Sequence, residues 1–207
     1  MASEPAPRRR GRPRQSPFGD GDTREALVRA GVAMLTEKGY SATGLDEILK
    51  SCRVPKGSFY HYFASKEQFG LVIVERYAAY FARRLDQFLL DESRAPLQRL
   101  AAFMDDAAAR MAAHDFRRGC LVGNLGQEMN ALPESFRAQL AGVLADWQAR
   151  VAACLALADD TLAEARPAQL AAFFWIGWEG AVLRAKLEAD DAALRIFARG
   201  FLALAGG

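Results

Sequence analysis

The sequence has little of what enzyme active sites and metal centres usually need. Its 207 residues contain two histidines and three cysteines, and Cys52, Cys120 and Cys154 lie far apart in the chain. Their spacing fits neither a metal site nor a disulfide framework. No glycine-rich phosphate loop and no recognisable Ser/His/Asp set occurs. We therefore predict a protein that is not an enzyme and that has no cofactor and no metal.

Long apolar runs are also missing. The longest fall well short of the roughly 18 residues that a membrane span needs. The N-terminus is basic and proline-rich, without the apolar segment of a signal peptide. Hydrophobic residues nevertheless make up 51% of the chain, which is enough to build a core. We expect a reduced, cytoplasmic protein with no membrane partner.

Charge is unevenly distributed, although the formal net charge is only +2. Residues 1–66 hold 12 Lys and Arg residues against 7 acidic ones, whereas residues 67–207 hold 15 against 18. This asymmetry predicts a small basic module that faces a polyanion and a larger, mildly acidic body. We divide the chain into a flexible basic arm (1–21), the basic module (22–66) and the body (67–207).

The arm carries the run R-R-R-G-R-P-R from Arg8 to Arg14. Its proline and glycine content cannot build a core, so a solvated tail is one interpretation. The segment R-G-R-P-R resembles an AT-hook, and an extended arginine arm can enter a narrow minor groove. Because the arm directly precedes the basic module, we favour contact with DNA.

Apolar residues recur at helical spacing through the rest of the chain, and no alternating strand pattern occurs. We predict an all-α fold of about nine helices. Thr43 is expected to cap a short second helix that starts at Leu45. The other helices are expected from near Asp22 to a stop at Lys38-Gly39, over the aromatic run after Pro55, from Ser65, from Pro96, from Gly119-Cys120-Leu121 to near Asn130, from Pro133, from about Ala168 to Lys186, and from about Asp190 to Leu204.

The segment V-P-K-G-S-F-Y-H-Y-F-A-S-K-E, residues 54–67, is the most informative stretch. Ser65 and Gln68 form a capping box for the helix that follows it. Phe59 and Phe63 lie four apart and can anchor one face of a short helix. The other face is left with a cation, a small residue that permits close approach, and side chains that end in hydrogen-bonding groups. Such a set suits contact with a groove of DNA: Lys56, Gly57, Ser58, Tyr60 and His61. Two short helices joined by a tight turn form a helix-turn-helix, and an ordinary surface turn is the alternative.

The segments G-Y-S-A-T-G-L-D-E-I-L and V-P-K-G-S-F-Y-H-Y-F-x-S-K-E resemble the DNA-binding domain of TetR-family transcriptional repressors over residues 22–70. With a later G-C-L segment, the chain is most similar to the NemR/AcuR branch, which responds to small electrophiles or acrylate-type compounds. The resemblance implies an N-terminal three-helix helix-turn-helix domain and a C-terminal helical domain for ligand binding and dimerisation. It also implies a homodimeric repressor of a palindromic operator, released by a small-molecule inducer, for which acrylate or a related electrophile is a candidate. We assign DNA contact to Arg8, Arg9, Arg10, Arg12, Arg14, Thr43, Lys56, Gly57, Ser58, Tyr60, His61 and Lys66.

The body is expected to hold the inducer between its helices. Cys120 opens a helix after two arginines, where helix-end amides and cations would favour a thiolate. The resemblance makes it the reactive or ligand-adjacent cysteine, and a buried, inert thiol is the alternative. The predicted lining is Tyr77, Phe103, Cys120, Met129, Trp147, Trp175 and Lys186, although each aromatic residue could equally belong to the core. A carboxylate ligand would need a cation, for which the candidates are Arg117, Arg118, Arg184 and Lys186.

The last two predicted helices combine small residues, which permit close helix approach, with large apolar side chains. Packing within one chain is one interpretation. The TetR resemblance, in which these helices build a four-helix dimer interface, favours a homodimer with its recognition helices roughly 34–36 Å apart. The predicted interface is Gly177, Trp178, Ala181, Phe197 and Phe201.

Two other functions stay open at this point. One is a thiol-dependent enzyme in a helical bundle, with Cys120 as its nucleophile, but no general base is evident. The other is a constitutive DNA-binding protein that senses no ligand. Neither explains both the basic module and the large acidic body as well as a regulator does.

Overall fold

The computed structural model describes residues 20–158 and 166–206, which form nine helices and no strand. The predicted all-α class is confirmed. The arginine run of the predicted arm lies outside the described residues. No helix in the described part is long and apolar enough to cross a membrane. The helices are α1 (Asp20–Lys38), α2 (Leu45–Ser51), α3 (Lys56–Tyr62), α4 (Lys66–Leu89), α5 (Pro96–Ala112), α6 (Leu121–Gln127), α7 (Ser135–Leu155), α8 (Arg166–Glu188) and α9 (Ala192–Gly206).

Several predicted helix ends differ from the structure by a few residues. Helix α1 begins at Asp20 rather than near Asp22, and α6 ends at Gln127 rather than near Asn130. Helix α7 is preceded by Glu134 as its N-cap, so Pro133 lies outside the first turn. Helix ends fray, so a short sequence signal places them only to within a few residues.

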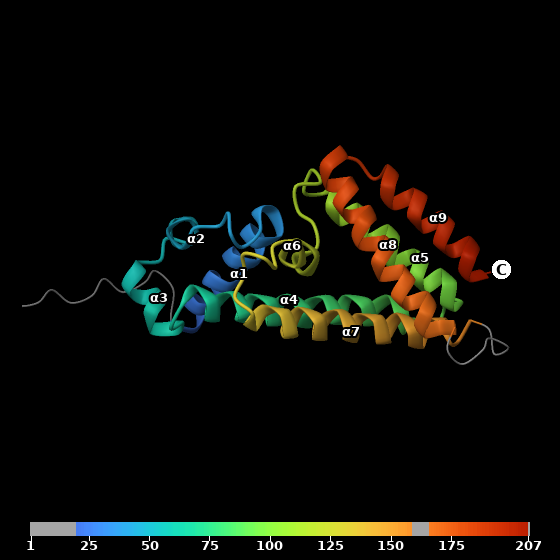
Figure 1. Ribbon diagram of the computed structural model, residues 1–207, viewed down its shortest axis with the longest axis horizontal. Helices are drawn as coiled ribbons and strands as arrows, with labels where there is room; N and C mark the ends of the chain where they lie inside the picture. Colours follow the sequence, from blue (N-terminus) through green and yellow to red (C-terminus); the bar gives the residue numbers. More distant parts are fainter. Residues whose placement is uncertain (1–19, 159–165, 207) are drawn as a thin grey trace, which may run out of the picture.

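The molecule is elongated, and the chain doubles back along it, so that α6 lies beside α1 (Figure 1). Helices α1, α2 and α3 lie at one end, and α4 leads from them into the body. There α4 packs beside α7, and α7 packs on α8, which in turn contacts α9. The short α6 contacts both α1 and α7. Helices α4 and α6 therefore both connect the N-terminal module to the body.

Helix α3 has seven residues, too few to be stable alone. An aromatic cluster holds it in place: Phe59 and Phe63 are buried against Phe69 of α4. The ring centroid of Phe59 lies 5.3 Å from that of Phe69, and the centroid of Phe63 lies 4.7 Å from it. The predicted anchoring of one face by Phe59 and Phe63 is confirmed. That face fixes the direction in which the opposite face of α3 points.

The start of α4 confirms the predicted capping box with a small change. The Ser65 hydroxyl accepts a hydrogen bond from the amide of Gln68 at 3.0 Å. The Gln68 side chain reaches back to the amide of Ala64, at 2.6 Å, one residue before the cap. The backbone amides of Ala64 and Gln68, on the two sides of the α3–α4 turn, thus both have hydrogen-bond acceptors. These bonds fix the orientation of α3 on α4.

Thr43 does not cap α2, contrary to the prediction. The N-cap is Gly44, without a side-chain hydrogen bond. Thr43 is instead fully buried, and its hydroxyl donates to the carbonyl of Gly39 at 2.6 Å. Gly39 has a φ of +81° and ends α1 as predicted.

Candidate functional site

The exposed face of α3 contains most of the predicted DNA contacts. Lys56, Gly57, Tyr60 and His61 are exposed, and Ser58 is half-buried. Tyr60 is 55% exposed although it is aromatic. Nothing lies within 4 Å of the position that a Cβ would occupy at Gly57, so a partner can approach the backbone there closely. The geometry suits insertion into a groove of duplex DNA.

Lys56 forms an ion pair with a neighbouring acid. Its ammonium lies 3.1 Å from a carboxylate oxygen of Asp46 on α2, and both side chains are largely exposed. The hydrogen bond to Asp46 and the attraction of its charge raise the pKa of Lys56. Lys56 is therefore cationic at neutral pH, and Asp46 competes with phosphate for it.

Two other predicted DNA contacts have internal partners. Thr43 is wrong as a DNA contact, because the residue is fully buried and has no accessible atom. The Lys66 ammonium donates to the carbonyl of Tyr40 at 3.0 Å and lies 4.3 Å from the Tyr40 ring centroid. Burial lowers the pKa of Lys66. Lys66 thus ties the start of α4 to the α1–α2 connection, and a phosphate contact by it stays a prediction.

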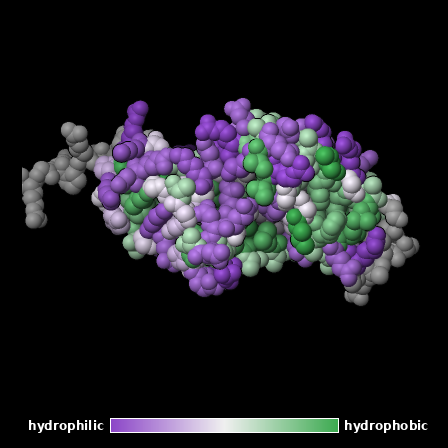
Figure 2. All heavy atoms as spheres, turned by 45° about the horizontal axis from the view of Figure 1, so that its top comes forward, coloured by the Kyte–Doolittle hydropathy of each residue, from purple (hydrophilic) through white to green (hydrophobic). Residues whose placement is uncertain are grey.

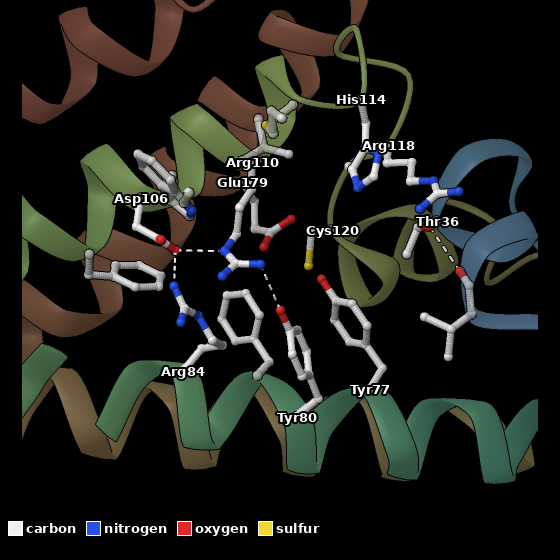
Figure 3. Close-up of a pocket in the computed structure, with 18 residues that line it drawn as sticks. Thr36, Tyr77, Tyr80, Arg84, Asp106, Arg110, His114, Arg118, Cys120 and Glu179 are labelled. Carbon is white, nitrogen blue, oxygen red and sulfur yellow. Dashed lines mark hydrogen bonds and ion pairs between the residues drawn. The ribbon is translucent and has the colours of Figure 1, made fainter. Parts of the chain in front are cut away.

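A cavity of about 270 Å³ lies between α1, α4, α5 and α8, at the start of α6 (Figure 3). Of the seven predicted lining residues, Tyr77, Phe103 and Cys120 reach it. Apolar walls come mainly from Phe81, Phe103, Met111, Trp178 and Val182. The polar and charged residues of the lining are Thr36, Tyr77, Tyr80, Arg84, Asp106, Arg110, His114, Arg118 and Glu179.

Four predicted lining residues do not reach the cavity. Trp147 is fully buried behind Phe81, with ring centroids 4.3 Å apart, and Trp175 packs on Trp147 at 5.3 Å. Met129 packs against the core from the end of α6. Lys186 is used elsewhere, since its ammonium donates to the carbonyl of Glu37 at 2.8 Å. The predicted lining is therefore wrong at these four positions.

An ionic network that sequence reasoning missed forms one wall of the cavity (Figure 3). Arg84 of α4 pairs with Asp106 of α5. Arg110 donates to Asp106 at 2.9 Å and to the Tyr80 hydroxyl at 3.1 Å. Burial alone would raise the pKa of Asp106, but hydrogen bonds from both arginines lower it. Asp106 is therefore part of the cavity wall, whereas its neighbour Asp105 is exposed. In the sequence, Tyr80 and Arg84 are four residues apart, as are Asp106 and Arg110. This spacing places the two members of each pair on the same face of a helix.

Cys120 is buried and is the N-cap of α6, where its sulfur accepts a hydrogen bond from the Gly123 amide at 3.4 Å. Burial raises its pKa well above the usual range, and the nearby Glu179 carboxyl raises it further. The predicted thiolate is therefore wrong. Of the cations near it in sequence, Arg117 pairs with Glu37 outside the cavity, and Arg118 lines the cavity. Arg184, another predicted candidate, pairs with Glu188. The structure favours the buried, inert thiol.

Glu179 is the second residue that sequence reasoning missed. It is the one acidic residue in the otherwise apolar stretch from Leu170 to Val182, which was a usable signal. Burial raises the pKa of Glu179 to about 7, although a hydrogen bond with Cys120 lowers it. Its Oε1 atom is buried and has no hydrogen-bond partner among the described residues. A buried carboxyl of this kind, facing a cavity, is a strong candidate for ligand contact.

Helix α6 connects the cavity to the N-terminal module. Its Asn124 side chain donates to the carbonyls of Leu35 and Thr36 at the end of α1, at 3.3 and 2.8 Å. The Glu128 carboxylate accepts from the amides of Tyr40 and Ser41 at 2.9 and 2.7 Å. Because Cys120 begins this helix at the cavity, a shift of α6 would be passed directly to the α1–α2 connection. We call these contacts of Asn124 and Glu128 the α6 clamp.

The predicted dimer residues pack within one chain. A Cβ at Gly177 would lie 2.2 Å from the Phe197 ring, so α8 and α9 meet there. Trp178, Ala181 and Phe201 are buried, and Trp178 lines the cavity. Three of the five residues are thus buried within the chain, and contact of this set with a second copy stays a prediction.

The outward faces of α8 and α9 carry a different apolar surface. Figure 2 shows hydrophobic side chains gathered over the body, whereas the end formed by α1 to α3 is largely polar. Ile176 is 75% exposed and Leu187 is 81% exposed. Gly180 lies between them with open space above its Cα. We call this set the apolar stripe: Phe173, Ile176, Gly180, Leu183 and Leu187 of α8, with Ile196, Gly200 and Leu204 of α9.

Comparisons with known proteins agree with this architecture. Residues 27–70 match the family "Bacterial regulatory proteins, tetR family", and residues 96–201 match "Tetracyclin repressor-like, C-terminal domain". The chain is 56% identical to the transcriptional regulator AcuR of Cereibacter sphaeroides, over 96% of this chain and 92% of that protein. It is 34% identical to the transcriptional repressor NemR of Escherichia coli, over 81% and 85% of the two chains.

Solved structures give the same result. The crystal structure of a regulatory protein TetR from Rhodobacter sphaeroides superposes with a TM-score of 0.84 and 58% identity, over 86% of this chain and 96% of that one. The reduced form of E. coli NemR superposes with a TM-score of 0.79 and 31% identity, over 87% and 95%. The resemblance inferred from residues 22–70 is confirmed.

Proposed function

Because the chain belongs to the TetR family of bacterial regulatory proteins, we propose that it is a homodimeric transcriptional repressor. It binds a palindromic operator and leaves it when a small carboxylate, with acrylate as the first candidate, occupies the cavity. The observation that carries this proposal is the α6 clamp, which joins the cavity to the helix-turn-helix through Asn124 and Glu128.

DNA binding is supported by the fixed orientation of α3. The Phe59–Phe63–Phe69 cluster buries one face, and Lys56, Gly57, Tyr60 and His61 are exposed on the rest of the helix. Lys56 and the arginines Arg8 to Arg14 are suited to phosphates, and the polar tips on α3 are suited to base edges. Affinity should therefore fall steeply as salt rises.

Dimer formation is supported by the apolar stripe, which a monomer would leave in water. A two-fold axis between two α8–α9 pairs would let each stripe cover the other. At its glycines, Gly180 and Gly200, no atom lies within 4 Å of the position that a Cβ would occupy, which leaves room for the partner's side chains. The same axis would present two α3 helices to successive major grooves on one side of the duplex.

Reversible ligand binding is supported by the state of Cys120. A buried thiol with a raised pKa is a poor nucleophile, which argues against covalent capture of an electrophile. It argues equally against a thiol-dependent enzyme. A constitutive DNA-binding protein would not need a cavity that holds an unpartnered carboxyl oxygen.

The proposal is tested by fluorescence anisotropy with duplexes from the DNA upstream of the protein's own gene. We expect tight binding to one palindromic segment, and release on titration with sodium acrylate. By linkage, saturating operator must weaken acrylate binding by the same factor as acrylate weakens operator binding. Equal acrylate affinity with and without operator would contradict the mechanism.

Replacing Cys120 by serine distinguishes reversible from covalent sensing. We expect Cys120→Ser to keep the acrylate-driven release of operator to within about threefold, because serine preserves a small capping side chain at the start of α6. Covalent capture would instead require the thiol, so loss of release in this variant, with operator binding intact, would contradict the reversible mechanism. The measurement is the acrylate concentration at half release.

Replacing Asp46 by asparagine should strengthen DNA binding. The change frees Lys56 from its ion pair and removes a negative charge beside α3. We expect affinity for any duplex to rise several-fold, and the slope of log K against log salt to become steeper by up to about 1. Glu92→Gln, an exposed acid beyond α4, is the matched control. Equal effects of the two changes would show that only net charge matters.

A further inference from the structure

Glu179 projects from α8 into the cavity and lies directly over the backbone of α6 (Figure 3). A Cβ at Gly123 would lie 2.0 Å from Glu179 Oε2, so the glycine makes room for the carboxyl. Part of the residue reaches the surface, but its Oε1 atom is buried and unpartnered among the described residues. The carboxyl is therefore held in place with one oxygen available to a ligand.

The groups beside Glu179 are protonated acids. The Tyr77 hydroxyl of α4 is hydrogen-bonded to the Cys120 sulfur, and the Cys120 thiol is hydrogen-bonded to the Glu179 carboxyl. Burial raises the pKa of Tyr77 and of Cys120 well above their usual ranges, so both keep their protons at neutral pH. If Glu179 is protonated too, its own O–H is a donor in this corner that has no acceptor, because Oε1 has no hydrogen-bond partner among the described residues.

The other charged groups of the cavity favour an anion. Arg84 and Arg110 are joined through Asp106, which neutralises part of their charge. Arg118, from the α5–α6 connection, makes no ion pair among the described residues. His114 lies on the same connection, and Thr36 of α1 uses its hydroxyl on the carbonyls of Val32 and Ala33. Three arginines thus face two carboxyl groups, and protonation of Glu179 increases the positive excess.

We propose that Glu179 recognises the ligand by taking up a proton from solvent as a small carboxylate binds, and by donating that proton in a hydrogen bond to the ligand's carboxylate. The inference rests on the proposed function and names the regulation of the same cavity. The one bond that forms is the O–H bond of Glu179: one proton leaves solvent, binds the carboxylate oxygen of Glu179, and is shared in a hydrogen bond with the bound carboxylate. The ligand's apolar body lies against Phe81, Phe103 and Trp178.

The sign of the pH dependence follows from this exchange. The ligand, with a carboxyl pKa of about 4, stays ionised above pH 6. Below the pKa of Glu179, which is about 7, the receptor is already protonated and affinity is constant. Above it, each binding event must take up a proton, so affinity falls about tenfold for every pH unit. Operator release by the ligand should weaken over the same range.

The test is isothermal titration calorimetry of the full chain with sodium propanoate, and with propanamide as the neutral analogue, at pH 6, 7, 8 and 9. Each titration is repeated in two buffers of different ionisation heat, which gives the number of protons taken up. For the wild type we expect uptake of nearly one proton per propanoate at pH 9. Affinity should fall about 50-fold from pH 7 to pH 9, because half of the carboxyl groups are still protonated at pH 7.

Glu179→Gln supplies the matched comparison, because its amide donates at every pH. We expect no proton uptake, a flat pH profile, and propanoate binding at pH 9 about 100-fold tighter than in the wild type. Glu188→Gln, an exposed acid at the end of α8, should keep the wild-type profile. If Glu179→Gln does not fold, the proton count of the wild type still decides the matter.

Three results would overturn the inference: no proton uptake by the wild type, the same pH slope in Glu179→Gln, or propanamide binding as tightly as propanoate at every pH. Operator anisotropy is measured on the same samples. Ligand-driven release without pH dependence overturns the role of Glu179 alone. If acrylate, propanoate and propanamide all fail to release the operator, the proposed function fails with it.

Discussion

Replacing Ile176 by glutamate is expected to convert the protein to a monomer and to weaken operator binding by roughly 100-fold or more. Ile176 lies in the middle of the apolar stripe on α8 and is 75% exposed in the single chain. In the proposed dimer, in which each stripe covers the other, the new carboxylate would be taken out of water, which is costly for an ionised group. A monomer holds only one half-site, so the gain from binding both half-sites at once is lost.

The folding of the single chain should survive this change, because Ile176 makes little contact with the chain's own core. Size-exclusion chromatography with light scattering measures the mass, and anisotropy with the operator duplex measures affinity. Leu90→Glu is the matched control, since Leu90 is 69% exposed and lies at the end of α4, outside the stripe. A dimeric Ile176→Glu protein, or a monomer with unchanged operator affinity, would place the dimer interface elsewhere.

Replacing Gly39 by alanine is expected to destabilise the protein by about 4 kcal/mol or more and to disturb operator binding. Gly39 has a φ of +81°, a conformation that costs an alanine about 1–2 kcal/mol. Its Cβ would also lie 1.8 Å from Glu128 Oε1, so the carboxylate would have to leave the amides of Tyr40 and Ser41. Hydrogen bonds of this charged kind contribute about 1.5–3 kcal/mol each.

A double-mutant cycle separates the two costs of Gly39→Ala. In a Glu128→Ala background the clash is already gone, so the same substitution should cost only the backbone term of about 1–2 kcal/mol. Urea unfolding measures each free energy. Gly142→Ala, at an open and exposed helical site in α7, should be neutral or stabilising. Equal costs in both backgrounds would show that Glu128 does not depend on the glycine.

The same variants examine the α6 clamp as a link to DNA binding. Glu128→Ala removes the carboxylate that holds the α1–α2 connection, and leaves the cavity intact, since Glu128 lies outside its lining. Ligand affinity without operator should then be unchanged, while the ligand's effect on operator affinity should shrink. This coupling is the quantity that a two-state regulator depends on.

The sequence by itself determined the features that depend on local periodicity. Helical spacing predicted nine helices, the Ser65–Gln68 capping box predicted the start of α4, and the four-residue spacing of Phe59 and Phe63 predicted the buried face of α3. The motif around α2 and α3 identified the family. Each of these signals lies within a few residues of chain, where backbone geometry decides which side chains share a face.

Only the tertiary structure decided what the body's residues do. The cavity wall draws residues from α1, α4, α5, α8 and the α5–α6 connection, so no local pattern could assemble it. Cys120 has helix-end amides and neighbouring arginines in sequence, which favour a thiolate. In the structure, burial and the Glu179 carboxyl raise its pKa, so the thiol stays protonated. Helix α8 has apolar residues on more than one face. The contact of Gly177 with Phe197 shows which face packs on α9, and Ile176 lies on the exposed side. Desolvation and helix packing are set by neighbours distant in the chain, which is why they required the fold.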